Sequence, residues 1–324
     1  MKILFWGGTQ GNNGPANINK GIVENLTVSF HSVRVRNKYL EMVEALWKLL
    51  FSDAVVVSGV SRKGSILVRF ARLLGKKSVY LMHGCAEYEM RLNGQKGMNK
   101  GLEQERHLLE NADLLLPVSE KFMHWFQERY PQFADKTEYL YNGMDADSLR
   151  ALQPKEKVPG SIVATGADRR VKNNAVVAQV IEHMGGKANL EVYGWIYHGA
   201  PEGFRYTKYM GAIPHKKYIE KLEETELFVL NSVFESFSIS AIEALMCGCS
   251  VLLSEIAGVT GILELEETDI IHDPMDAEEI RSKIVYLLEH PNNERILSKL
   301  DQDEWTFAKM VERLEEKCRK LLDA

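Results

Sequence analysis

Two glutamates, Glu235 and Glu243, bracket seven uncharged residues in FESFSISAIEALMCGC (234–249). The preceding run ELFVLNS (226–232) predicts a buried strand, so Glu235 is expected on the following loop and Glu243 in the first turns of a helix. Residues Ser236 to Ser240 would form the helix entry, where backbone N–H groups lack partners within the helix. Together the two carboxylates could accept hydrogen bonds from neighbouring sugar hydroxyls. Either glutamate alone is better interpreted as a surface acid or a helix N-terminal charge.

A second candidate site is the basic loop in SIVATGADRRVKNNAVVAQVI (161–181). A strand is expected to end at Gly166 and a helix to start near Asn173, with Arg169, Arg170 and Lys172 between them. The helix dipole disfavours cations at this end unless an anion is also present. The loop therefore indicates a diphosphate site; the alternative is a solvated basic turn.

The third candidate is the glycine-rich loop WGGTQGNNGPANINKGI (6–22), which follows the first expected strand. Its glycines would let the backbone approach a sugar or phosphate, and Pro15 could start the next helix. Its spacing is GGxxGxxG, and the later segment SFHSVRVRNK is basic where NAD binding needs an acid, so a dinucleotide site is disfavoured. A turn that uses glycine only for geometry is the other interpretation. The glycines concerned are Gly7, Gly8, Gly11 and Gly14.

Short apolar runs that alternate with helical periodicity predict the elements that hold these loops. Such runs lacking in–out alternation are typical of parallel strands covered by helices on both faces, an α/β arrangement. A stretch with two prolines and no apolar periodicity, RALQPKEKVPGS (150–161), predicts a linker between two Rossmann-like domains in tandem. Ligands bind such sheets beyond the carboxyl ends of the strands. The expected strands are 2–6, 53–57, 78–82 and 113–117, then 161–166, 189–194, 226–232 and 250–255.

Composition narrows the class of protein. The chain has 324 residues and a net charge of -5, which disfavours nucleic acid as a partner. No window is apolar enough for a membrane-spanning helix, and the N-terminus has too short an apolar run for a signal peptide, so a cytoplasmic protein is expected. Four cysteines without zinc-site spacing are expected to be reduced, inert thiols.

The run ESFSISAIEALMCGCSVLLSE resembles the E-x7-E signature of retaining GT-B glycosyltransferases of family 4, also called group 1. Further segments resemble the family in the expected order: VYLMHG, ADLLLPVSE, YNGMD, TGADRRVKN, NLEVYG, YMGAIPHKKYIEKLEETELFVLNS and IIHDPMDAEEI. The resemblance covers nearly the whole chain and is strongest over 161–290. It implies two Rossmann-like doubly wound domains facing a central cleft, with an acceptor-side domain at 1–152 and a nucleotide-sugar domain at 153–300. A C-terminal helix at 301–324 could pack on either domain, including by crossing back to the first.

The resemblance also implies roles for individual residues. Glu243 would bind the ribose hydroxyls, and Glu235 the hydroxyls of the donor sugar. Lys172 would neutralise the diphosphate, helped by Arg169 or Arg170. The catalytic residues implied are His83, beside the transferring sugar, Lys172 and Glu235.

The remaining implied contacts are mostly with backbone. The helix entry would cradle the distal phosphate, Gly211 and Ile213 would face the base, and the glycine loop would approach the donor phosphates or the acceptor. Two departures from the family pattern are Ala167, where the loop arginine is usual, and serines in place of the glycines of E-G-F-G. The backbone contacts are Phe237, Ser238, Ile239 and Ser240 at the entry, with Gly8 and Gly14 in the glycine loop.

The activity implied is transfer of a sugar, with retention, from a nucleotide-sugar donor to a glycan or lipid-linked saccharide in cell-surface polysaccharide biosynthesis. Neither metal nor other cofactor is expected, and a DxD-like triplet, Asp145-Ala146-Asp147, lies near the expected linker. The alternatives are a GT-B nucleotide-sugar epimerase and a non-catalytic nucleotide-sugar-binding protein. A short-chain oxidoreductase is disfavoured because no Tyr-x-x-x-Lys spacing occurs.

A peripheral membrane contact is a separate hypothesis. The stretch SRKGSILVRFARLLGKKS (61–78) has six basic residues, no acid and an apolar helical face, which would suit an anionic bilayer. The alternative, which the fold favours, is that this apolar face packs on the sheet.

Overall fold

The computed structural model describes residues 1–10, 14–32, 37, 40–94, 99–152, 155–199 and 201–324. Gly11 of the predicted glycine loop lies outside the described residues, and so do residues 153–154 of the predicted linker. The chain divides into two compact units. The first unit comprises Met1–Arg91, Gln95–Asp145 and Gln302–Ala324, and the second comprises Leu92–Gly94 and Ala146–Asp301. The division thus falls after Asp145, whereas the sequence placed it after residue 152.

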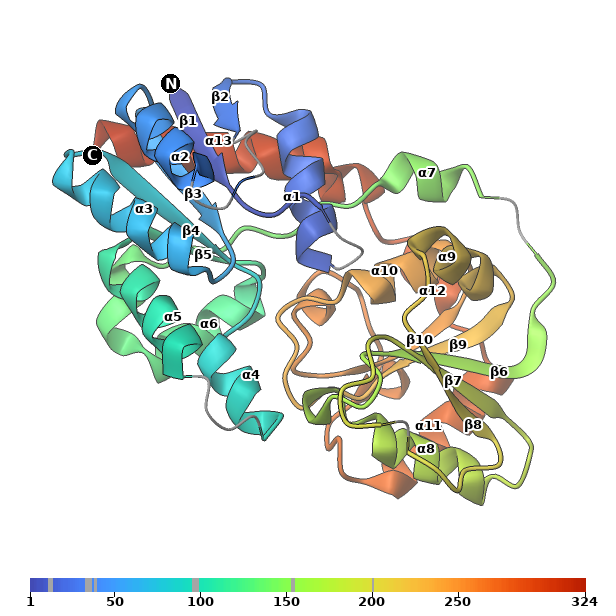
Figure 1. Ribbon diagram of the computed structural model, residues 1–324. Coiled ribbons are helices and arrows are strands. Elements are labelled where there is room, and N and C mark those ends of the chain that lie inside the picture. Colours follow the sequence, from blue (N-terminus) through green and yellow to red (C-terminus); the bar gives the residue numbers. More distant parts are fainter. Residues whose placement is uncertain (11–13, 33–36, 38–39, 95–98, 153–154, 200) are drawn as a thin grey trace. The chain divides into compact units, whose positions relative to one another are not determined.

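The first unit contains a five-stranded parallel sheet in the order β2-β1-β3-β4-β5 (Figure 1). Four of its strands lie where short apolar runs predict them, and β3 is buried along its whole length. The edge strand β2 has the sequence SFHS, which has too few apolar residues to be recognised as a strand. The bounds are β1 (Lys2–Trp6), β2 (Ser29–Ser32), β3 (Ala54–Ser58), β4 (Lys77–Met82) and β5 (Leu114–Pro117).

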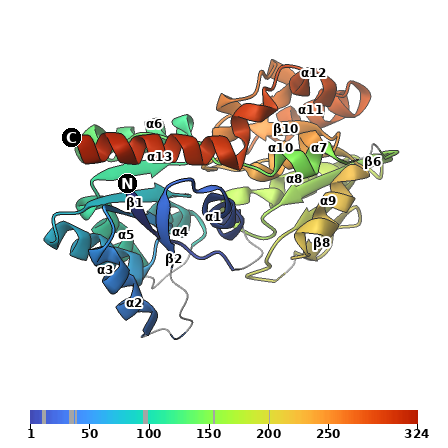
Figure 2. The ribbon, with the colours of Figure 1, turned by 90° about the horizontal axis from the view of Figure 1, so that it is seen from above.

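Helices cover both faces of this sheet, with α6 and α13 on one side and α2, α3 and α5 on the other (Figure 2). In α3, capped by Ser61, the apolar side chains Leu67, Val68 and Ala71 are fully buried. The apolar face of 61–78 therefore packs inside the fold, as the alternative to membrane contact expected. The helices are α1 (Gly14–Asn25), α2 (Leu40–Leu50), α3 (Arg62–Leu73), α4 (Ala86–Leu92), α5 (Asn99–Asn111), α6 (Glu120–Arg129) and α13 (Phe307–Asp323), with 3-10 turns η1 (Pro131–Lys136) and η5 (Gln302–Trp305).

The C-terminal helix α13 packs on α1 of the first unit. The Glu315 carboxylate accepts hydrogen bonds from the backbone N–H of Thr27 at 2.7 Å and of Val28 at 3.0 Å. The ring of Phe307 lies so close to Gly21 that a Cβ there would be 2.3 Å from it, which explains a glycine inside α1. The last helix is thus part of the first unit's structure.

The second unit contains a six-stranded parallel sheet in the order β11-β10-β9-β6-β7-β8. The linker prediction was too long: α7 (Ala146–Arg150) lies at its start, and β6 already begins at Val158. Neither β8, which alternates buried and exposed residues, nor the two-residue β11 was predicted. The bounds are β6 (Val158–Thr165), β7 (Asn189–Tyr193), β8 (Thr207–Gly211), β9 (Thr225–Leu230), β10 (Ser250–Ser254) and β11 (Ile270–Ile271).

In the second unit α8 and α11 cover one face of the sheet and α9, α10 and α12 the other (Figure 1). A buried cluster that includes Val177, Ile181, Val192 and Ile284 joins α8 and α11 to the strands. The bounds are α8 (Asn174–His183), α9 (His215–Glu223), α10 (Ile239–Met246), α11 (Ala277–Glu289) and α12 (Asn293–Leu297), with 3-10 turns η2 (Arg170–Lys172), η3 (Gly258–Gly261) and η4 (Glu267–Asp269). None of the described helices combines the length and apolarity needed to cross a bilayer.

Candidate functional site

The loops that follow β6 and β9 meet at the carboxyl edge of the second unit's sheet. The backbone N–H of Val233 donates to the carbonyl of Val171 at 2.9 Å, which joins the two loops. Beside this bond Lys172 Nζ donates to Glu235 Oε2. Only 14% of the lysine side chain and 12% of the glutamate side chain are exposed. The structure thus brings together two candidate residues that are 63 positions apart in the sequence.

The position of Lys172 depends on glycine at the end of β6. A Cβ on Gly166 would lie 2.3 Å from Lys172 Cγ, so the lysine stem can cross the backbone only because residue 166 has no side chain. Gly166 also has a φ of +93°, which favours glycine. Gly166, which was predicted as the end of a strand, therefore also leaves the space that the Lys172 side chain occupies.

Backbone strain is concentrated in the same two loops. Among the described residues, three that are not glycine have positive φ: Ala167 at 47°, Asn173 at 51° and Ser238 at 83°. Ala167 and Asn173 flank the basic turn, and Ser238 precedes α10. Such conformations cost on the order of 1–3 kcal/mol each and are typical of binding and catalytic loops. Ser238 stands where the resembled family pattern has glycine, so a serine here occupies a backbone conformation that favours glycine.

The entry to α10 is supported from behind by η3. The carbonyls of Glu235 and Phe237 accept hydrogen bonds from the N–H groups of Gly258, at 3.1 Å, and Val259, at 2.9 Å. The Phe237 ring is 2% exposed and anchors the loop in the core. The side chain of Ser238, the N-cap, makes no hydrogen bond to the helix. First-turn N–H groups of an α-helix have no acceptor within the helix, so they are suited to an anion here.

Glu243 lies on α10 and contacts a histidine that the sequence did not single out. His215 Nε2 is 2.7 Å from Glu243 Oε1, and the glutamate side chain is only 12% exposed. His215 begins α9, two residues after the predicted base-contacting Ile213. Its distance from Glu243 in sequence hid the pairing.

The other candidates of this unit lie on neighbouring strand ends. Gly211, at the end of β8, accepts a hydrogen bond from Gly194 N at 3.0 Å. Arg169 caps η2 and is partly buried, whereas Arg170 is exposed. Ile213, Ile239 and Ser240 are partly exposed.

In the first unit, the glycine loop is joined to His83 through two polar side chains. Asn19 Nδ2 donates to the carbonyl of Gly8 at 2.9 Å, so its Oδ1 accepts the Ser58 hydroxyl at 2.5 Å. The Ser58 oxygen then accepts from His83 Nε2 at 2.7 Å. Asn19 and Ser58 were not predicted, since neither belongs to a recognisable spacing.

This chain of hydrogen bonds sets the state of His83. Burial lowers the pKa of the His83 imidazole to about 4, so it is neutral near pH 7. With Ser58 as acceptor, the proton of the neutral ring lies on Nε2. His83 is therefore held in one tautomer and one orientation, as a site residue must be.

The glycines of the loop differ in how far the fold requires them. A Cβ on Gly7 would lie 2.8 Å from Asn19 Nδ2 and 2.9 Å from Ser58 Cβ. Gly8 and Gly14 have no described atom within 4 Å of such a Cβ. Packing therefore explains Gly7, while Gly8 and Gly14, the predicted contacts, face open space.

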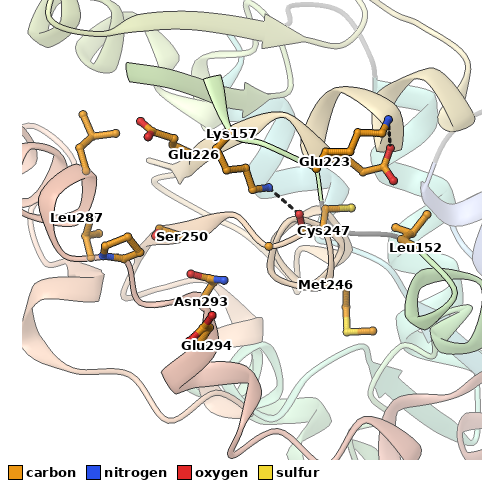
Figure 3. A pocket seen from close by; sticks show the side chains of 14 residues that line it. Leu152, Lys157, Glu223, Glu226, Met246, Cys247, Ser250, Leu287, Asn293 and Glu294 are labelled. Atoms are coloured by element: carbon orange, nitrogen blue, oxygen red, sulfur yellow. Dashed lines mark hydrogen bonds and ion pairs between the residues drawn. The ribbon is translucent and has the colours of Figure 1, made fainter. Parts of the chain in front are cut away.

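A pocket of about 610 Å³ lies elsewhere, at the amino ends of β6, β9 and β10 (Figure 3). Its lysines are bound within the fold: Lys157 Nζ donates to the carbonyl of Cys247 at 2.6 Å, and Lys155 pairs with Glu223 at 2.6 Å. It contains no candidate residue. We therefore assign the site to the carboxyl edge of the sheet and not to this pocket.

Within the described residues, neither the cysteines nor the DxD-like triplet forms a second site of this kind. All four cysteines are buried and free, and burial raises the pKa of each thiol to about 12. Asp147 of the DxD-like triplet is exposed and pairs with Arg150 at 3.4 Å. Over the described ranges, no three His, Cys, Asp or Glu side chains are grouped as a metal site would require.

Comparison with known proteins finds a family match almost entirely within the second unit. Residues 205–302 match the family model for glycosyl transferases group 1. This segment includes Glu235, Glu243 and His215 and excludes Lys172. A curated relative from Campylobacter jejuni, N-acetylgalactosamine-N,N'-diacetylbacillosaminyl-diphospho-undecaprenol 4-alpha-N-acetylgalactosaminyltransferase, is 25% identical over 203 residues. The match covers 57% of this chain and 53% of the relative, so the chain spans about half the length of that protein.

Solved structures match over nearly the whole chain. HepE from Anabaena, solved with UDP and glucose, has a TM-score of 0.72 at 13% identity, covering 99% of this chain and 100% of that one. Sucrose-phosphate synthase from Thermosynechococcus elongatus has a TM-score of 0.66 at 15% identity, covering 99% of each chain. At these identities the likeness concerns the fold. The fold is GT-B, built from two Rossmann-like units.

Proposed function

We propose that this protein is a retaining, metal-independent glycosyltransferase of family 4, which moves a sugar from a nucleotide-sugar donor to a glycan or lipid-linked saccharide. The observation that carries the proposal is the contact of Lys172 with Glu235 beside the α10 entry. It puts a cation, a carboxylate and first-turn N–H groups at one sheet edge. A diphosphate joined to a sugar needs these groups together. The match of 205–302 to the group 1 family model supports the same assignment.

The donor is proposed to bind across the two loops of the second unit. Its distal phosphate would meet the first-turn N–H groups of α10, and Lys172 would turn from Glu235 to the phosphate oxygens. Glu235, released from the lysine, would accept sugar hydroxyls. Glu243 would accept the ribose hydroxyls while His215 holds it in place. HepE was solved with UDP, which makes a uridine nucleotide the first donor class to test.

The chemistry proposed needs no covalent enzyme intermediate. The bond from the anomeric carbon to the phosphate oxygen breaks, and the acceptor oxygen forms its bond on the same face of the sugar. The acceptor proton passes to the departing phosphate. Lys172, with Arg169 or Arg170, stabilises the charge that develops on the diphosphate, the part a metal ion performs in other transferases. Neutral His83 would orient the transferring sugar without adding charge beside it.

The acceptor is proposed to belong to cell-surface polysaccharide biosynthesis. The curated relative is named for transfer to a diphospho-undecaprenol saccharide, which makes a lipid-linked acceptor the first class to test. We place the reaction in the cytoplasm, with peripheral membrane contact.

A screen of nucleotide sugars followed by a release assay tests the proposal. A ligand at 100 times its dissociation constant adds about 2.7 kcal/mol to the free energy of unfolding, so the correct donor is expected to raise the melting temperature. Nucleoside diphosphate should then be released only with acceptor, and a chelator should not slow it. Release without acceptor would favour the epimerase alternative. Stabilisation without release, with every acceptor tried, would favour a binding protein.

A further inference from the structure

Helix α2 of the first unit has two apolar faces, and only one of them is buried inside the unit. Ala45 and Leu49 are fully buried on the inner side. Along the opposite side lie five apolar side chains that are 47–64% exposed: Leu40, Val43, Trp47, Leu50 and Phe51. Their spacing of three, four, three and one residues forms a single stripe on a helix. The Trp47 and Phe51 rings contact edge to face, with centroids 5.3 Å apart.

Helix α3 extends this stripe. Phe70, Leu73 and Leu74 are 42%, 81% and 42% exposed near the end of α3. The two helices lie side by side (Figures 1 and 2). They are joined by an ion pair of Lys63 with Glu41 and by a hydrogen bond from Lys76 Nζ to the Ser52 carbonyl. We call the five α2 and three α3 side chains the α2–α3 surface.

The α2–α3 surface is unusual within this molecule. Of 16 large apolar side chains that are exposed in the described part of the chain, these eight make up half. Isolated exposed apolar residues are ordinary, but a contiguous set marks an interaction site.

The net charge around the α2–α3 surface indicates which kind of partner it binds. Residues 40–78 contain seven Lys or Arg and three Asp or Glu, a net charge of +4 in a chain whose net charge is -5. Two of the three acids, Glu41 and Glu44, are already paired with Lys63 and Lys48. Arg62, Arg69 and Arg72 are exposed on α3. The apolar stripe therefore has a basic border.

We propose that the α2–α3 surface docks on an anionic lipid bilayer. Exposed aromatic and aliphatic side chains on a helix can insert into the headgroup region of a bilayer and bury their apolar area there. Trp is enriched at this membrane–water interface. Each basic residue near an anionic surface adds about 1 kcal/mol. A second copy of the chain fits less well, because two positively charged surfaces would repel. This proposal rests on the peripheral membrane contact of the proposed function and names the surface that makes it; it uses no residue of the transfer site.

This docking surface differs from the one expected in the sequence. The sequence placed the contact on the apolar face of 61–78, but that face is buried against the sheet. α2 contributes most of the apolar stripe, and the α3 segment contributes the basic border and the exposed Phe70, Leu73 and Leu74.

Co-sedimentation of the full chain with lipid vesicles tests the proposal. Vesicles of phosphatidylcholine mixed with phosphatidylglycerol are expected to bind the protein, and vesicles of phosphatidylcholine alone to bind it much less. The double variant Trp47→Ala with Phe51→Ala should bind the mixed vesicles about tenfold less or weaker still. Trp195→Ala, which removes an equally exposed Trp from the second unit, is the matched control and should bind like wild type.

A second variant separates charge from apolar contact. Arg69→Glu with Arg72→Glu should remove the preference for anionic vesicles while leaving the melting temperature unchanged, since both side chains are exposed. The proposal is overturned if the wild type fails to bind mixed vesicles at low salt, or if Trp47→Ala with Phe51→Ala binds as well as wild type. It is also overturned if sedimentation velocity shows a dimer that this variant dissolves, because the stripe would then bind a second copy. Turnover with a soluble acceptor should be unchanged in these variants, so loss of docking and loss of transfer are separable.

Discussion

The two units hold their candidate residues by different means. In the second unit Lys172 forms an ion pair with Glu235, and Glu243 is hydrogen-bonded to His215. In the first unit the candidates form a neutral chain of hydrogen bonds from the Gly8 carbonyl through Asn19 and Ser58 to His83. The charged groups of the second unit are available to pair with a bound ligand. The hydrogen-bonded chain of the first unit keeps His83 uncharged and in a fixed orientation.

The difference matches what each unit would contact in a transfer reaction. A nucleoside diphosphate is highly charged, so its site must supply cations and N–H donors. The transferred sugar and the acceptor hydroxyl are neutral groups, for which a rigid neutral hydrogen-bond donor or acceptor is sufficient. Removing a charge should therefore disturb the second unit's chemistry more than removing a hydroxyl disturbs the first unit's.

Loss of the site lysine should have the largest effect. We expect Lys172→Ala to reduce kcat about 10²–10³-fold, because the developing diphosphate charge loses its nearest cation. Nucleoside diphosphate release measures this, and the melting temperature should show an intact fold. Lys187→Ala, which removes an exposed lysine of the same unit, is the control. Near-normal turnover of Lys172→Ala would remove the assignment of this loop.

Neutralising the ribose carboxylate should have a smaller effect. Glu243→Gln should raise KM for the donor about tenfold and change kcat little, because a charge-assisted hydrogen bond to the bound nucleotide becomes a neutral one. Initial rates at varied donor concentration measure both constants. Glu289→Gln, at the exposed end of α11, should behave like wild type. A fall in kcat with unchanged KM would instead place Glu243 at the reacting bond.

His83 should make stability depend on pH. Its pKa is about 4 in the folded protein and about 6.5 in an unfolded chain, so between these values the unfolded state binds more protons. The free energy of unfolding should therefore fall as pH drops from 6.5 to 4, by about 2–3 kcal/mol from this group. Urea unfolding across that range measures it, and His83→Gln should lose this part of the slope. An unchanged slope in the variant would show that other groups cause it.

Relieving backbone strain should have the smallest effect. Ser238→Gly should raise the free energy of unfolding by about 0.5 kcal/mol, because glycine accepts a φ of 83° more readily than serine. Ser236→Gly is the matched control: its φ is not positive, so added chain entropy should make it slightly destabilising. Equal changes in the two variants would mean that position 238 is not strained.

Much of the fold could be predicted because buried parallel strands consist of short runs of apolar residues, which are visible in the sequence. Eight strands were predicted this way, and each appears within a few residues of its expected place. The short strands β2, β8 and β11 were missed, because an edge strand needs few apolar residues and β8 is buried on one face only. The linker was placed too widely because VPG (158–160) reads as a turn, although it begins β6.

The site was predictable to the extent that its residues lie close together in the sequence. Glu235, Glu243 and Lys172 belong to short recognisable segments. Asn19, Ser58 and His215 were missed because each is ordinary in its own segment and is placed beside a candidate only by folding. The departure at Ser238 was visible, but its positive φ was not.

The sequence by itself determined the alternation of strands and helices, the family resemblance and the charged residues at the strand ends, since these depend on local residue order. Only the tertiary structure decided that Lys172 touches Glu235, that His83 is neutral and fixed, and that one apolar stripe of α2 is left exposed. The physical reason is that pairing, burial and pKa depend on neighbours brought together across long sequence separations. The sequence shows which side chains are present, and the tertiary packing determines which of them are in contact.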